Sequence, residues 1–300
     1  MTDIRKPYRP KTLVIGWIIA VPLVVLLIVF LATNERFRWQ VVGQYLTAPA
    51  ILSGVWLTIW LTFVSMLIGV VLGVILAVMV RSKSGLLSWL ASGYIWFFRG
   101  TPLLVQLVFW YNLSALLPSL SVGSTQIDIN AIITPMTAAI LGLGLNEAAY
   151  MAEIVRAGLL SVDNGQKEAA EALGLRPVQV LRKVILPQAM RAIIPPTGNQ
   201  VVGMLKNTSL VSVLGAADLL HSAQVIYSMN FQTIPLLIVA SLWYLVLTTV
   251  LSVGQHYLER YFGRSLTNRN FKRKAPAAGT EQIMTVPIQT VDLKDQEDAK

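Results

Sequence analysis

The chain has 300 residues, of which 55% are hydrophobic and only 13% charged, with a net charge of +9. A soluble domain carries about a quarter charged residues, so this composition indicates an integral membrane protein. The absence of cysteine excludes disulfides, thiol catalysis and thiolate metal sites. The positive charge does not indicate nucleic-acid binding, because the basic residues lie beside apolar runs, as in cytoplasmic loops.

The first apolar run covers residues 13–32 and follows a basic segment, residues 1–12. It is long for a signal peptide and lacks a small-x-small cleavage site, so we expect a retained first span. It would serve as an accessory anchor, with the N-terminus inside. Residues 33–50 form the following outer loop.

The second span is expected from about Ile51 to Val80, and its Gly69-x-x-x-Gly73 pair would let another helix pack closely. Residues 86–98 are apolar and aromatic, as in a helix at the membrane interface. Pro102 disfavours helical geometry before it, so the run should break near Gly100 and a third span follow, residues 103–117. Arg99 would then lie at the inner edge, as a snorkelling anchor or with a role in transport.

The fourth span, about residues 132–158, is unusually polar for a membrane helix. Ionisable groups in a span usually face a bundle interior or a cavity. Its candidate substrate-path residues are Asn146, Glu147, Tyr150 and Glu153. Asn146, Tyr150 and Glu153 share one helix face by their spacing.

The fifth span, about residues 192–214, starts irregularly and adds Lys206, Asn207 and Ser209 to the candidate path. The depths of Glu147 and Lys206 in their spans are compatible, so the two could pair. The alternatives are a structural ion pair, two charges in wet cavities that never meet, or two groups that contact the charged ends of a substrate.

The sixth span is expected at residues 233–258, followed by a basic tail, residues 259–300, that is disordered from Ala275 onward. Six spans place both termini in the cytoplasm. Lys and Arg outside the spans then lie almost entirely on the inner side, which agrees with the rule for orientation.

The large polar loop between the fourth and fifth spans covers residues 164–191. We expect two short helices that bend sharply at Gly174, which can adopt the left-handed conformation. Asp163 or Asn164 would cap the first helix, and Glu168 would lie in its first turn. Pro177 suits the start of the second helix, and Pro187 should weaken its far end.

The same loop carries a family resemblance. Glu168-Ala169-Ala170, three residues, Gly174, nine residues and then Val184-Ile185-Leu186-Pro187 resembles the EAA loop of bacterial ABC importer permeases. The family usually has Ile where this chain has Val184. The words FRGTPLLVQ from Phe98, YMAEIVR from Tyr150 and KNTSL from Lys206 resemble the branch that carries polar amino acids.

The resemblance covers roughly residues 50–260 and implies an all-α membrane helix bundle, a type I ABC importer transmembrane domain at residues 51–258 with five core helices. It implies a multi-pass subunit of the bacterial inner membrane that pairs with itself or a sister permease. Two ATPase subunits, which bind ATP and Mg²⁺, would receive the loop, and an extracytoplasmic binding protein would deliver an amino acid. The implied coupling residues are Glu168, Ala169, Ala170, Gly174, Leu186 and Pro187.

Two other functions compete with this interpretation. The chain has no glycine-rich phosphate loop, no metal cluster and no catalytic triad, so we expect neither an enzyme nor a bound cofactor. An ion-driven secondary transporter often shows internal repeats, which are not evident here. A membrane scaffold without a conduction path would not need polar fourth and fifth spans.

Overall fold

The computed structural model describes residues 10–122 and 125–267, and nearly all of them are helical. The predicted tail from Ala275 to Lys300 and most of the basic segment 1–12 lie outside the described residues. One small antiparallel hairpin, β1 (Ser119–Val122) and β2 (Thr125–Asp128), is the exception to the helical fold. The predicted all-α membrane bundle is confirmed.

Four helices in the described part of the chain are long and apolar enough to cross a membrane. These are α1 (Pro10–Thr33), α3 (Pro49–Val80), α8 (Pro135–Leu160) and α13 (Thr233–Thr267). They correspond to the predicted first, second, fourth and sixth spans. Short elements η1 (Glu35–Phe37) and α2 (Trp39–Leu46) join α1 to α3.

The fifth span is irregular, as its prolines predicted, but it begins earlier than residue 192. Helix α11 covers Leu186–Asn207, contains Pro195 and Pro196, and continues as a 3₁₀ segment, η3 (Thr208–Leu214). The segment Pro177–Leu214 is long and apolar enough to cross a membrane only together with α12 (Leu219–Asn230), and the two are bent by 43° relative to each other.

The predicted third span, residues 103–117, is interrupted at Asn112. After α4 (Gly85–Gly100) the chain breaks at Thr101 and Pro102, as expected, and α5 then covers only Leu103–Tyr111. Asn112 separates it from α6 (Leu113–Leu116), and the Asn112 amide donates to the Val108 carbonyl at 2.8 Å. The hairpin and α7 (Ile129–Ile132) follow, so the predicted outer loop 118–131 is folded.

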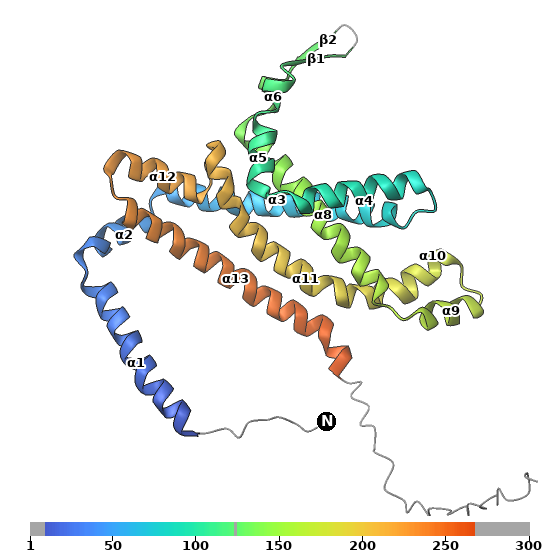
Figure 1. Cartoon of the computed structure of the whole chain (residues 1–300), viewed down its shortest axis with the longest axis horizontal. Coiled ribbons are helices and arrows are strands. Elements are labelled where there is room, and N and C mark those ends of the chain that lie inside the picture. The colour runs from blue at the N-terminus through green and yellow to red at the C-terminus, as the bar shows by residue number, and fades with distance from the viewer. Residues whose placement is uncertain (1–9, 123–124, 268–300) are drawn as a thin grey trace, which may run out of the picture. The chain divides into compact units, whose positions relative to one another are not determined.

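The core lies where α3 crosses α8 at very short range. A Cβ added to Gly69 would lie 2.5 Å from Cγ of Glu147, and one added to Gly73 would lie 2.5 Å from Cβ of Met151. The predicted close packing at Gly69-x-x-x-Gly73 is therefore confirmed. Helices α5 and α11 also pack on α8, so α8 is the central element around which the polar groups are arranged (Figure 1).

Candidate functional site

The first site is the polar segment that joins α8 to α11. Its first helix is α9 (Asn164–Ala172), and its second begins with α10 (Pro177–Val180) and a π-helical turn, η2 (Leu181–Ile185). Figure 1 shows α9 and α10 together at the ends of α8 and α11 that lie away from α12.

Gly174 makes the bend, as predicted. Its φ is +77°, and no heavy atom lies within 4 Å of the position that a Cβ would occupy. The Gly174 N–H donates to the Glu171 carbonyl at 2.9 Å, and the Leu175 N–H donates to the Ala170 carbonyl at 3.2 Å. These two bonds form a Schellman motif, so backbone conformation rather than crowding requires glycine here.

The start of α9 corrects one prediction. Asp163 is the N-cap, and its side chain accepts from the Gly165 N–H at 2.7 Å. Glu168 is the fifth helical residue, so it lies beyond the first turn, where the helix dipole acts most strongly. Glu168 and Ala169 are exposed, whereas Ala170 is buried.

The predicted short second helix is also wrong, because α10, η2 and α11 are continuous. Pro187 falls in the first turn of α11, immediately after the π-helical turn, in which the Leu186 N–H donates to the Leu181 carbonyl. A proline inside a regular helix would clash with the carbonyl four residues earlier. The wider π-helical turn comes where that clash would arise, so the helix passes Pro187 instead of ending there.

Sequence reasoning missed the two most exposed apolar side chains of this segment. Leu173 is 82% exposed and Val178 is 74% exposed, and they lie on either side of the Gly174 bend. Apolar side chains this exposed in a polar loop are typical of a protein contact. The available signal was their position next to the predicted bend.

The second site lies at the break between α4 and α5. The Gln106 amide donates to the Phe98 carbonyl at 2.9 Å, to the Thr101 carbonyl at 3.1 Å and to the Thr101 hydroxyl at 2.7 Å. The Asn146 amide donates to Phe98 at 3.0 Å and to Oε1 of Gln106 at 3.1 Å. Two buried side chains thus satisfy the carbonyls that the break leaves without helical partners.

A polar cavity of about 530 Å³ opens beside this break. Its walls come from the break itself, from α8 and from α11 with η3. Among the predicted path residues it contains Asn146, Glu147, Tyr150 and Asn207, and it adds Arg99, Thr101 and Gln200, which were not in the predicted set.

The polar cavity holds one cation and one carboxyl group. The Arg99 guanidinium carbon lies 5.4 Å from the centroid of the Tyr150 ring, a cation–π distance. Glu147 is only 4% exposed, and its Oε1 has no hydrogen-bond partner among the described residues. A buried carboxyl oxygen without a hydrogen-bond partner is costly, so Glu147 is an unsatisfied polar group in the wall of the polar cavity.

Three predicted path residues lie elsewhere. Glu153 pairs with Arg156, whose Nε donates to Oε2 at 2.9 Å and whose second nitrogen contacts Oε1. Lys206 is exposed, does not line the polar cavity, and has no ion pair with Glu147 in the part of the chain that the structure describes. The Ser209 hydroxyl donates to the Lys206 carbonyl at 2.7 Å.

The sequence of the chain matches a known protein family. The family described as "Binding-protein-dependent transport system inner membrane component" matches residues 69–264. The chain belongs to this family. The permease is therefore a multi-pass inner-membrane component of an importer, and the predicted membership of the polar amino acid branch is confirmed. ATP hydrolysis resides in a separate subunit.

The permease resembles transporters of several amino acids. It is 46% identical to the arginine transport system permease protein ArgU of Corynebacterium glutamicum over 88% of this chain and 86% of that protein. It is 37% identical to the L-cystine transport system permease protein TcyB of Bacillus subtilis over 78% of this chain and 95% of that protein. A crystal structure of an amino acid ABC transporter with histidines matches with a TM-score of 0.63 and 38% identity, covering 71% of this chain and 94% of that chain.

Proposed function

We propose that the permease carries an amino acid through the polar cavity at the α4–α5 break, with the two charged ends of the substrate between Arg99 and Glu147. The observation that carries this proposal is that one guanidinium, that of Arg99, and one buried carboxyl group, that of Glu147, line the same polar cavity. A substrate carboxylate suits the fork of donors on Arg99, and an ammonium or guanidinium group suits Glu147.

The sequence allowed Glu147 to pair with Lys206. In the structure Glu147 shares the polar cavity with Arg99, and Lys206 does not line it. Relatives that are named for arginine and for cystine both carry zwitterionic cargo, which agrees with a site of two opposite charges. Asn207 and Gln200 add hydrogen-bonding groups from α11 to the same cavity.

The proposal assigns coupling to residues 164–191. ATPase subunits that bind ATP and Mg²⁺ would receive the exposed turn around Gly174, and Leu173 and Val178 would enter an apolar groove on the ATPase. The exposure of both side chains supports this role. Ala170 would hold the turn in shape from inside, while Glu168 and Ala169 would lie on the contact surface, and Leu186 and Pro187 would carry the motion into α11.

The remaining partners follow from the same arrangement. A second permease copy or a homologous permease would complete the translocation path, and a binding protein outside the membrane would deliver the amino acid. Both termini of the permease would lie in the cytoplasm, on the side of residues 164–191. ATP binding would shift the conformational equilibrium through its preference for one state of the assembled complex.

Uptake in proteoliposomes tests the function. The permease is reconstituted with its ATPase and binding protein, and labelled arginine and cystine are compared. We expect ATP-dependent uptake that falls about tenfold or more in Arg99→Gln and in Glu147→Gln, because each variant loses a charge-assisted contact. Arg36→Gln, which removes a cation from the outer connection, is the matched control and should transport normally.

Two outcomes would overturn the proposal. Uptake that persists without any ATPase subunit would identify an ion-driven secondary transporter. Normal uptake by both cavity variants would move the substrate path away from the α4–α5 break.

A further inference from the structure

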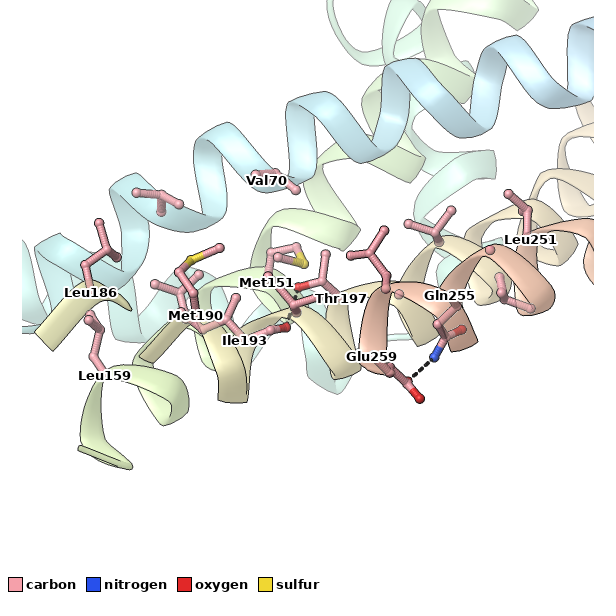
Figure 2. A pocket seen from close by; sticks show the side chains of 18 of the residues that line it. Val70, Met151, Leu159, Leu186, Met190, Ile193, Thr197, Leu251, Gln255 and Glu259 are labelled. Carbon is pink, nitrogen blue, oxygen red and sulfur yellow. Dashed lines mark hydrogen bonds between the residues drawn. The ribbon is translucent and has the colours of Figure 1, made fainter. Parts of the chain in front are cut away.

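Besides the polar cavity, the permease has an apolar groove of about 690 Å³. Its walls are α3, α8, α11 and α13, and Figure 2 shows its side chains along both faces of the groove. Val70, Met151, Ile193 and Leu251 are representative of the lining. The groove is therefore apolar and is formed largely by helices that are long and apolar enough to cross a membrane.

The groove is separate from the proposed substrate path. Gly198 and Val202 line the groove, whereas Gln200 lines the polar cavity. Two residues along an α-helix correspond to a rotation of about 200°, so the groove and the polar cavity lie on opposite sides of α11. Neither the substrate nor its charged groups have a role on the apolar side.

The groove continues into a basic cavity of about 420 Å³ that shares Val78, Leu159 and Leu181 with it. Arg81, from the end of α3, and Lys167, from α9, line this basic cavity. Helices α3 and α8 both end at this point, and in the proposed orientation this end lies at the cytoplasmic membrane surface.

Among the described residues, neither cation of the basic cavity is held in a short ion pair, and the cavity is lined by these two cations and one carboxylate. Lys167 Nζ is 3.9 Å from Oε1 of Glu171, a long and exposed contact. The carboxylate that lines the basic cavity, Asp163, already accepts from the Gly165 N–H. In the apolar groove, Oε1 of Glu259 accepts from the Gln255 amide at 2.8 Å on the α13 side, as Figure 2 shows.

We propose that the apolar groove and the basic cavity together bind one phospholipid of the inner leaflet. An acyl chain would fill the groove, and the phosphate would lie between Arg81 and Lys167. The residues of α11 that line the groove extend from Met190 to Val202, about 18 Å along the helix. This length is close to half of the hydrocarbon thickness, which is the depth of one leaflet. Basic pockets between spans on the cytoplasmic side are suited to lipid head groups.

A lipid at this site would affect coupling because of the helices that form the site. The groove and the basic cavity are lined by α3 and α8 from the core, by α9 and η2 from the coupling segment, and by α11 beyond the π-helical turn. A bound phospholipid therefore fills the space between the coupling segment and the spans that it moves.

Native mass spectrometry of the full-length permease in its detergent-solubilised complex tests the proposal. The probes are a phosphatidylglycerol and the diacylglycerol with the same acyl chains. Gly254 lines the groove with open space at its Cβ position, so Gly254→Phe is expected to place its ring in the groove. We expect about tenfold weaker retention of phosphatidylglycerol in Gly254→Phe and in the double variant Arg81→Gln/Lys167→Gln.

Two matched variants act as controls. Gly93→Phe adds the same ring at another open glycine, on α4, and Arg260→Gln removes a cation of α13 that lines neither cavity. Both should retain the lipid, and wild-type permease should retain phosphatidylglycerol better than diacylglycerol. Equal retention by all variants would overturn the proposal. The proposal would also fail if Gly254→Phe changed the number of permease copies in the complex while the amount of bound lipid stayed the same. That result would show that a second permease copy occupies the groove.

Discussion

Gln106 and Asn146 donate to the same backbone oxygen, that of Phe98, and Asn146 also donates to the Gln106 side chain. The two residues lie on different helices, α5 and α8, and both are buried. Because Phe98 directly precedes Arg99, this shared oxygen fixes the segment from which Arg99 reaches the polar cavity. Asn146, which was predicted to line the substrate path, lines the polar cavity and also supports its wall through its amide group.

The shared oxygen predicts that the two amides act as one unit. Gln106→Leu and Asn146→Leu should each cost about 1–3 kcal/mol, because each removes a hydrogen bond to the Phe98 oxygen and the bond between the two amides. The double variant should cost clearly less than the sum, since the second change removes a bond that the first has already broken. Thermal unfolding of the purified complex, followed for all four members of the cycle, measures this coupling. Strict additivity would show that the amides act independently.

Gly174 should be sensitive to backbone conformation alone. Its Cβ position is open, so Gly174→Val meets no steric obstacle, but a non-glycine residue in the left-handed region costs about 1–2 kcal/mol. We expect Gly174→Val to insert normally and to lose substrate-stimulated ATP hydrolysis. Gly174→Asn should retain more stimulation, because Asn tolerates this region better.

The control for this series is Gly85→Val. Gly85 also has open space at its Cβ position, but no positive φ, and it lies at the start of α4. Normal stimulation in Gly174→Val would remove the conformational argument, and loss of stimulation in Gly85→Val would show that the assay responds to any added side chain.

The exposed pair Leu173 and Val178 gives a prediction about ATPase binding. Burying each side chain in a partner groove would contribute about 1.5–3 kcal/mol, so Leu173→Ser and Val178→Ser should weaken the permease–ATPase complex about tenfold or more. Glu168→Lys should reduce stimulation with a smaller effect on affinity, because Glu168 is exposed and polar. The affinity of the ATPase for the permease in nanodiscs, measured beside substrate-stimulated ATP hydrolysis, separates weaker binding from reduced stimulation. An unchanged affinity in both serine variants would exclude these side chains as anchors.

The sequence predicted features that depend on single residues and missed those that depend on neighbours. Gly174 permits a left-handed backbone, Pro102 disfavours helix at the residue before it, and the Gly69-x-x-x-Gly73 pair permits close helix packing. The bend, the break and the close crossing could therefore all be predicted. The continuation of the helix through Pro187 could not, because a π-helical turn has no clear pattern in the sequence. The partner of Glu147 could not be predicted either, because apolar periodicity does not show which charged side chain from another helix shares a cavity with it.

Glu147 and Lys206 provide a last prediction, because the structure separates two residues that the sequence allowed to pair. Glu147 is buried against Gly69 and faces the polar cavity, whereas Lys206 is exposed outside it. The charge-swapped variant Glu147→Lys/Lys206→Glu should therefore fail to restore uptake. Glu147→Lys alone should be the more damaging change, since it buries a second cation beside the cavity that Arg99 also lines.

Arg99 offers the comparison that decides between the two partners. If Glu147 and Arg99 share one substrate, Glu147→Gln and Arg99→Gln should each raise the half-saturating substrate concentration for uptake, while Lys206→Gln should change it little. The measurement is the concentration dependence of uptake in proteoliposomes at matched permease content. Recovery of uptake in Glu147→Lys/Lys206→Glu would show that these two residues form an ion pair, which the described structure does not contain. The substrate contacts would then lie elsewhere.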